Sequence, residues 1–168
     1  HSARGVFCLD PLDGTSNFAG GFPFFAFSLA LWRFGRVELG VVYDPVRREC
    51  FSAAAGHGAW HNDYYLKSLP PVPETLASCL ALVDFKRLPP ALAWRLVSEA
   101  PYRSQRNLGS VALDWCWMAI GRGQLYLHGG QKPWDYLAGH LIAQEAGIAT
   151  RLLSISGQQA LAGLSLEP

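Results

Sequence analysis

The sequence predicts an α/β (α+β) domain, and three observations lead to this fold class. Short apolar runs separated by turn residues fill the first half of the chain, whereas strand-like and helix-like segments alternate in the second half. Of the 168 residues, 50% are hydrophobic and 16% are charged, which favours a buried core and excludes a disordered chain. The formal net charge of +1 offers no basic surface, so no nucleic-acid partner is expected.

Strands joined by turns are predicted for the first half. The first strand stops abruptly at a turn-rich segment, residues 10–14, which carries two carboxylates. The turn Phe34-Gly35-Arg36 joins the next two strands into a hairpin, and Asp44-Pro45 ends the hairpin. The predicted strands are Val6–Leu9, Phe24–Trp32, Val37–Tyr43 and Glu49–Ala53.

In the second half, strands alternate with amphipathic or apolar helices. Pro90 stands near a helix start, where its missing N–H costs little, and Gly147 occupies the favoured position after a helix end. The predicted elements are a strand at Leu80–Val83, helices at Pro90–Ala100 and Gly109–Gly121, a strand at Leu125–Leu127, and a helix at Asp135–Ala146.

A proline-rich stretch over residues 62–74 predicts a junction between two units. The first unit, residues 1–66, is β-rich and carries the Asp-Pro-Leu-Asp-Gly-Thr motif. The second, residues 67–168, is α/β and carries a Trp-Asp motif. Neither unit contains an internal repeat.

Membrane spanning and disulfide bonding are not expected. The longest apolar run, Phe22–Trp32, has eleven residues, whereas a membrane-spanning helix needs about 20. The four cysteines, at positions 8, 50, 79 and 116, form neither a Cys-x-x-Cys pair nor a cluster with histidines. We therefore expect a reduced, cytoplasmic protein.

The first chemical candidate is the acidic turn. Asp10 and Asp13 lie three residues apart, and both side chains and the Leu12 carbonyl between them can face one point, where hard oxygen ligands suit Mg²⁺. If a helical turn opens at Gly14 and Thr15, its free N–H groups offer an adjacent anion site. The alternative is that Asp10 caps a turn and Asp13-Gly14 is an ordinary surface turn.

Two further candidates lie near the C-terminal helix. Asp135 follows Lys132-Pro133-Trp134 and could close a metal site from a distant part of the chain, or could simply cap the helix. His128 precedes Gly129-Gly130 in a loop position that suits a binding residue. Taken singly, a hydrogen-bonded structural histidine is the favoured interpretation of His128.

Two longer motifs carry a family resemblance. The run Asp10-Pro11-Leu12-Asp13-Gly14-Thr15-Ser16-Asn17-Phe18 resembles the first signature of the inositol monophosphatase family of metal-dependent phosphatases. The run Trp134-Asp135-Tyr136-Leu137-Ala138-Gly139, continuing to Glu145-Ala146-Gly147, resembles the second. The similarity also covers Gly40–Pro45, Gly56–Trp60 and Arg106–Ser110.

The resemblance implies a layered αβαβα sandwich of the sugar-phosphatase type, with Mg²⁺ and phosphate between the two halves of the chain. It also implies the site residues. Asp10, the Leu12 carbonyl, Asp13 and Asp135 would hold metal, and Thr15, together with Asp13, would be catalytic. The substrate-binding set would be Leu12, Gly14, Thr15, Gly109, Ser110, Val111, His128 and Asp135.

The sequence also departs from the family pattern. The family's N-terminal helices and hairpin, with a Gly-Glu-Glu motif that supplies a metal-binding glutamate, do not occur here, so we expect an N-terminally truncated form with weak or no activity by itself. Without those helices, an apolar sheet surface around Phe25, Phe27, Leu29 and Leu31 should be exposed. His128 stands where members that hydrolyse inositol phosphates place a glutamate, which argues against inositol 1-phosphate as substrate.

The sequence therefore predicts a Mg²⁺-dependent, Li⁺-sensitive phosphomonoesterase that hydrolyses a small polyol, sugar or nucleotide phosphate, acting as a homodimer. The alternative is a catalytically impaired family member that binds phosphate or metal, or serves as an interaction subunit.

Overall fold

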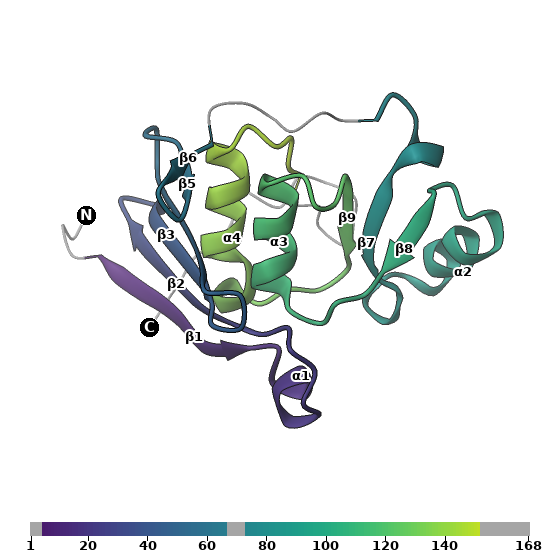
Figure 1. Cartoon of the computed structure of the whole chain (residues 1–168), viewed down its shortest axis with the longest axis horizontal. Coiled ribbons are helices and arrows are strands. Elements are labelled where there is room, and N and C mark those ends of the chain that lie inside the picture. The colour runs from purple at the N-terminus through teal and green to yellow at the C-terminus, as the bar shows by residue number, and fades with distance from the viewer. Residues whose placement is uncertain (1–4, 67–72, 152–168) are drawn as a thin grey trace.

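The computed structural model describes residues 5–66 and 73–151. The chain forms successive layers: a six-stranded sheet, a pair of helices, a three-stranded sheet and an outer helix (Figure 1). The predicted α/β (α+β) class is confirmed. The predicted junction between residues 66 and 67 borders residues 67–72, which lie outside the described part of the chain.

The six-stranded sheet is antiparallel, and its strands follow one another in chain order. Phe34 and Gly35 both have positive φ, 54° and 80°, as a two-residue hairpin turn requires, so the predicted turn is confirmed. The strands are β1 (Val6–Asp13), β2 (Ala26–Arg33), β3 (Arg36–Asp44), β4 (Glu49–Ala54), β5 (Ala59–His61) and β6 (Tyr64–Tyr65).

The first strand is longer than predicted and irregular. We expected a turn at residues 10–14, but β1 continues to Asp13, and its pairing with β2 shifts between Asp10 and Asp13. Pro11 lies in this bulge, where it donates no ladder hydrogen bond. Residues three apart in a regular strand face opposite sides, and the extra residue of the bulge puts Asp10 and Asp13 on the same side.

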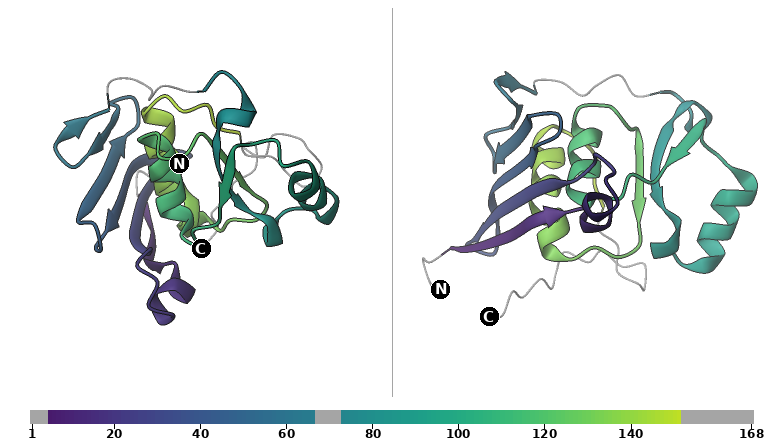
Figure 2. Two further views of the ribbon diagram at one scale, coloured as in Figure 1. Left: turned by 45° about the vertical axis from the view of Figure 1, so that its right-hand side comes forward. Right: turned by 60° about the horizontal axis from the view of Figure 1, so that its bottom comes forward.

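Two buried helices form the second layer, α3 (Val111–Ala119) and α4 (Pro133–Glu145). Both lie between the two sheets (Figures 1 and 2). Their side chains form one core cluster with those of β2, β3 and β4, which explains why both helices are apolar nearly all round. Gly147 has φ 87° and follows Ala146, the residue that caps α4, so the predicted helix end is confirmed.

Gly40 of β3 lets α4 lie directly on the sheet. A Cβ at this position would stand 2.8 Å from the carbonyl oxygen and 3.0 Å from the Cα of Ala138. We expect Gly40→Ala to destabilise the fold by about 1–3 kcal/mol, because helix backbone must shift to make room. Denaturant unfolding measures this, with Gly130→Ala as the matched control, since a Cβ at Gly130 meets nothing within 4 Å. Equal losses in both variants would contradict the close approach.

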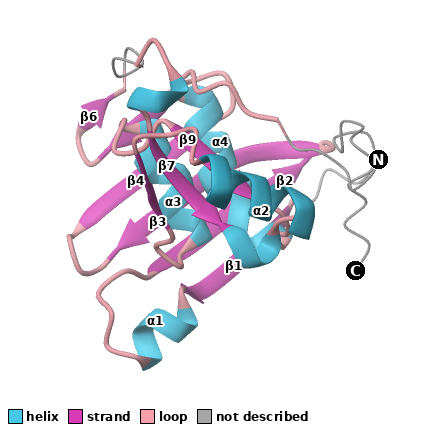
Figure 3. Ribbon diagram, turned by 90° about the vertical axis from the view of Figure 1, so that its right-hand side faces the viewer, coloured by secondary structure: helices cyan, strands magenta, loops and turns pink. Residues whose placement is uncertain are grey.

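A small parallel sheet forms the third layer, in the order β8–β7–β9. Its strands are β7 (Leu80–Asp84), β8 (Ser104–Arg106) and β9 (Leu125–His128). Helix α2 (Pro90–Glu99) covers the outer side of this sheet, as seen face-on in Figure 3. Leu96 of α2 packs on a second core cluster that contains Ala81 and Val83.

The predicted helices and the strands of the second half are confirmed within a few residues, and β8 was not predicted. The helical turn considered at Gly14 and Thr15 is present as α1 (Thr15–Ala19). Other short elements were missed: β5, β6, and the 3-10 turns η1 (Leu76–Ser78) and η2 (Phe85–Arg87). They are too short to show a hydrophobic period. Both α1 and η2 border the site described below.

The face of the large sheet opposite α4 is apolar and open. The expected exposure is confirmed for Phe27, whereas Phe25, Leu29 and Leu31 are half-buried. The most exposed members lie on alternate strands, β1, β3 and β5: Phe7 is 68% exposed, and Leu9, Leu39, Tyr43 and Trp60 are also exposed. Among the described helices, none is long and apolar enough to cross a bilayer.

Candidate metal and phosphate site

Three carboxylates from two distant segments meet where β1 ends and α4 begins. Asp10, Asp13 and Asp135 each offer a carboxylate oxygen, and these three atoms lie within 4.8 Å of one another. The bulge in β1 turns the first two toward α4. The Ser28 hydroxyl on β2 donates a 3.3 Å hydrogen bond to the carbonyl of Trp134, which fixes the helix start beside them.

Each carboxyl is oriented by hydrogen bonds to one of its oxygens only. Asp10 Oδ1 accepts from the Leu12 N–H at 3.0 Å, and Asp135 Oδ2 accepts from the Lys132 N–H at 2.8 Å. Asp13 Oδ2 accepts from the Ser110 hydroxyl at 2.5 Å and from the Ala112 N–H at 2.8 Å. The second oxygen of each group accepts no hydrogen bond from the described residues and is available to a ligand.

The electrostatics of the cluster favour a cation. Asp13 is only 7% exposed, and burial raises its pKa to about 6, with further contributions from the charges of Asp10 and Asp135. Burial is also the main cause that raises the pKa of Asp10. A bound divalent cation would offset both penalties, and carboxylate oxygens are the ligands that Mg²⁺ prefers. The residues present therefore fit a hard divalent cation.

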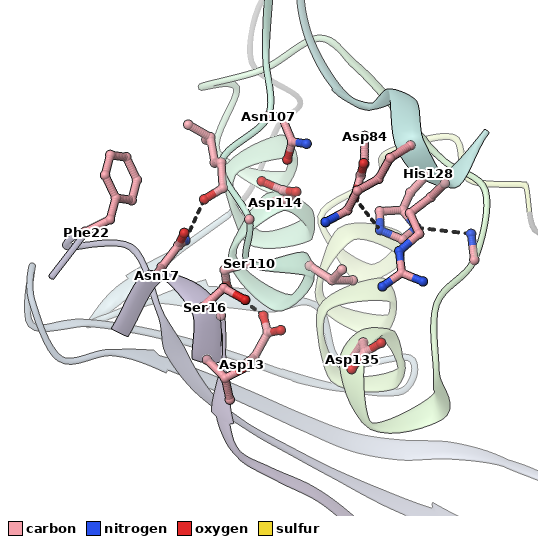
Figure 4. A pocket seen from close by; sticks show the side chains of 18 residues that line it. Asp13, Ser16, Asn17, Phe22, Asp84, Asn107, Ser110, Asp114, His128 and Asp135 are labelled. Atoms are coloured by element: carbon pink, nitrogen blue, oxygen red, sulfur yellow. Dashed lines mark hydrogen bonds and ion pairs between the residues drawn. The ribbon is translucent and has the colours of Figure 1, made fainter. Parts of the chain in front are cut away.

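A polar pocket of about 500 Å³ opens beside the acidic cluster. Asp13 and Asp135 lie at one end of it, and Asp84 and His128 lie at the other (Figure 4). The second end is formed where the parallel strands β7 and β9 finish, the edge of such sheets at which ligands bind. The pocket thus joins the acidic cluster of the large sheet to the polar edge of the small one.

Asn17 holds the two glycine loops of the pocket together. Its side-chain amide donates to the carbonyls of Phe24 and Leu108, both at 2.7 Å. Gly14 and Gly109 have φ values of 85° and 80°, and a Cβ at Gly14 would stand 3.3 Å from the Gly109 carbonyl oxygen. Only glycine combines this backbone conformation with so close an approach. The start of α1 is thereby fixed beside residues 109–111.

Known proteins are similar to this chain over most of its length. The sequence profile described as the inositol monophosphatase family matches residues 1–163. The chain belongs to this family. Among curated inositol monophosphatase relatives, Nus factor SuhB of Pasteurella multocida is 42% identical over 146 residues, which cover 83% of this chain and 53% of that protein. The chain spans about half the length of the curated relatives it matches.

Solved members of the inositol monophosphatase family share the fold. The extragenic suppressor protein SuhB of Bartonella henselae aligns with a TM-score of 0.77 and 35% identity, over 86% of this chain and 58% of that one. SaIMPase-II with bound inositol monophosphate aligns with a TM-score of 0.76 and 29% identity, over 84% and 55% of the two chains. The layered α/β fold of this chain is therefore that of the family.

The family-derived site residues lie as follows. The pocket is lined by Asp13, Gly14, Thr15, Gly109, Ser110, Val111, His128 and Asp135. Asp10 belongs to the acidic cluster, and Leu12 lies in the β1 bulge between Asp10 and Asp13. Ser110 is fully buried and both donates to Asp13 and accepts from the Leu113 N–H at 3.4 Å, so its hydroxyl orients a carboxylate.

His128 is held by its neighbours. Its Nδ1 accepts from the Gly130 N–H at 3.2 Å, and its Nε2 lies 3.6 Å from Asp84 Oδ2. The imidazole is 6% exposed, and burial lowers its pKa, so it is neutral at pH 7 and carries its proton on Nε2. It presents no fixed charge to a ligand.

Several pocket residues were given no role from the sequence. They are Ser16, Asn17, Phe22, Asp84, Lys86, Arg87, Asn107, Leu108, Asp114 and Gly130. Asp114 is 6% exposed, its Oδ1 has no partner among the described residues, and burial raises its pKa well above the ordinary value. The available signal was a single acid inside the otherwise apolar segment Val111–Ala119.

We expect Mg²⁺ to stabilise the fold more at pH 7.5 than at pH 5. The folded-state pKa of Asp13, about 6, is above the ordinary aspartate value of 3.8, so without cation the contribution of this group to stability is fully present below pH 3.8 and is lost as pH rises through 6. A cation binds the ionised carboxylate of Asp13, so the stability gained from Mg²⁺ grows as pH rises from 3.8 through 6. Thermal unfolding with Mg²⁺ and with EDTA measures the difference.

His140 provides the control for this experiment. Burial lowers its pKa to about 4, so its contribution to stability is lost as pH falls from 6.5 through 4. This loss is the same with and without cation and cancels in the difference. A Mg²⁺ effect of equal size at both pH values would contradict the role assigned to Asp13.

Proposed function

We propose that the chain is a Mg²⁺-dependent phosphomonoesterase that hydrolyses a small polyol, sugar or nucleotide phosphate. The observation that carries the proposal is the meeting of Asp10, Asp13 and Asp135 beside a polar pocket of about 500 Å³. Family membership supports it, and so does the bound inositol monophosphate of the related SaIMPase-II.

Asp10, the Leu12 carbonyl, Asp13 and Asp135 would hold the cation. When bound, Mg²⁺ would neutralise phosphate oxygens and lower the pKa of a water molecule. The backbone N–H groups of Gly14 and Thr15 would donate to the phosphate at the start of α1, where free N–H groups point outward. The Thr15 hydroxyl would orient the water that attacks phosphorus as the bond to the alcohol oxygen breaks.

The remaining residues would position the alcohol. Gly109, Ser110 and Val111 form the wall next to Gly14, and Asn17 fixes that wall through its hydrogen bond to Leu108. Phosphoryl transfer depends mainly on positioning and on neutralising charge, which suits a site built from rigid loops and buried acids.

The direct test is phosphate release from a panel of phosphomonoesters, with Mg²⁺ and with EDTA, and with Li⁺ as inhibitor. The proposal predicts release that requires Mg²⁺ and falls with Li⁺. Release that is unchanged in EDTA would refute the proposed metal dependence.

A second candidate function is that of a non-catalytic subunit, and the open apolar face of the large sheet favours it. Phe7 on β1 is 68% exposed, and Leu39 on β3 and Trp60 on β5 are also exposed. The curated relative named Nus factor SuhB gives this candidate further support. It predicts a dimer or other complex by light scattering, and binding of Mg²⁺ without turnover. A turnover number of about 1 per second would exclude it.

A further inference from the structure

Four acidic side chains line the pocket, and none of them forms an ion pair with a lysine or arginine among the described residues. Asp13 and Asp135 accept backbone or hydroxyl hydrogen bonds and belong to the cation cluster. Asp84 lies against the neutral imidazole of His128, at 3.6 Å. Asp114 is buried without a charged partner among the described residues, and burial raises the pKa of its carboxyl well above the ordinary value.

The pocket is also lined by two cationic side chains, Lys86 and Arg87. Lys86 and Arg87, on η2, both line the pocket and are exposed, and neither forms an ion pair within residues 5–66 and 73–151. Both lie near enough to His128 to contribute to lowering its pKa. Asp84 lies against His128 and forms no ion pair with either cation, so both cationic groups are available to an anion.

The position of these cations is fixed by the backbone. Gly129 packs so closely on η2 that a Cβ there would stand 1.7 Å from the Arg87 carbonyl oxygen. The turn that carries Lys86 and Arg87 is therefore seated on the loop after β9, next to His128. This is the end of the pocket away from Asp13, as the positions of Asp84 and His128 in Figure 4 indicate.

The pocket therefore has two binding ends. A phosphate bound at Asp13 and Asp135 through a cation would leave the Lys86 and Arg87 end free. A volume of about 500 Å³ leaves room for a sugar or polyol between the two ends, since small-molecule pockets span about 300–1,000 Å³. The free end would attract an anion, because exposed cations without a partner pair readily with phosphate or carboxylate.

We propose that the substrate is a phosphomonoester carrying a second anionic group, a phosphate or a carboxylate, which Lys86 and Arg87 bind at the end of the pocket opposite the acidic cluster. The proposal rests on the phosphatase function proposed above and narrows its substrate class. Lys86 and Arg87 would be specificity residues, since they contact the substrate far from the reacting phosphorus.

The test measures by calorimetry the affinity of the protein for two matched pairs of probes, with Ca²⁺ in place of Mg²⁺. Fructose 1-phosphate and fructose 1,6-bisphosphate differ by a second phosphate, and sorbitol 6-phosphate and 6-phosphogluconate differ by a carboxylate. We expect the second anion to tighten binding about tenfold, a free-energy gain of about 1.4 kcal/mol. This gain should fall as salt rises, because partly exposed charges are screened.

The double variant Lys86→Ala/Arg87→Ala should remove the preference, so that the two members of each pair bind with equal affinity. Lys86→Glu/Arg87→Glu should reverse the preference. Arg36→Gln removes an exposed cation from the distant β2–β3 turn and should keep the wild-type preference.

The outcomes distinguish failure of this inference from failure of the proposed phosphatase function. A preference that survives in both double variants, or a wild type without one, would overturn this inference while leaving hydrolysis of single phosphates intact. If a carboxylate alone gives the preference, the second group is a carboxylate, and the proposal holds in that form. Failure of every probe to bind would overturn the phosphatase function and this inference with it.

Discussion

Asp13→Asn is expected to lower phosphate release by about 100-fold or more while making the cation-free protein more stable. The loss follows because a buried ligand of the proposed cation becomes neutral, and positioning-driven reactions lose orders of magnitude when a positioning group is removed. The gain follows because burial penalises the ionised carboxyl, whose pKa is raised to about 6. The amide oxygen of Asn can still accept from Ser110 and Ala112.

Because phosphate release should fall while the stability of the cation-free protein rises, the test separates a role in cation binding from a role in the fold. A role confined to the fold would lower stability and activity together. Asp63→Asn, an exposed position outside the pocket, is the matched control and should change neither. Phosphate release and thermal unfolding in EDTA give the two readouts, and calorimetry should show weaker Mg²⁺ binding by the variant. Undiminished hydrolysis by Asp13→Asn would refute the assigned role.

The largest loss of stability is expected for Asp44→Ala, about 3 kcal/mol. The Asp44 side chain is 0% exposed and accepts from the N–H groups of Val46 and Arg47, at 2.9 and 3.0 Å. It also pairs with the Arg47 guanidinium at 2.8 Å. Removing one partner of a buried pair leaves the other without compensation, which costs about 3–5 kcal/mol in fully buried cases. The partial exposure of Arg47 places this pair at the lower end.

The Asp44→Ala substitution should also disturb the pocket. Arg47 lies over the rings of Phe24 and Trp117 and donates to the carbonyl of Pro23, so it supports the loop whose Phe24 carbonyl holds Asn17. Asp44→Asn keeps the acceptor for the turn but not the charge and should lose less stability. Chemical denaturation of both variants measures the difference. Equal losses would show that the hydrogen bonds from Val46 and Arg47 to Asp44 contribute nothing and that the charge of Asp44 accounts for the whole loss.

Local pattern was sufficient for most of the elements. Short apolar runs predicted β2, β3 and β4, and the prolines and glycines between them marked their turns, because these features depend on neighbours along the chain. The strand β1 was predicted too short, since Asp10 and Pro11 resemble a turn in sequence but form a bulge when paired with β2. That pairing supplies the hydrogen bonds that keep the strand extended.

The two aspartate motifs identified the family from sequence, and they named the acidic residues of the site. What the motifs could not supply was the second end of the pocket. Asp84 and His128 stand at the ends of separate parallel strands, and Lys86 and Arg87 lie on a turn without a sequence period. Their proximity depends on the order β8–β7–β9.

By itself, then, the sequence determined the order of elements, the family and the chemical type of the ligands, because residue identity and local spacing carry that information. Only the tertiary structure decided which groups share a pocket and in what charge state. Burial sets the pKa of Asp13 and Asp114, and the approach of α4 to Gly40 brings Asp135 to the β1 bulge. Both are consequences of contacts between segments far apart in the chain, which no local pattern encodes.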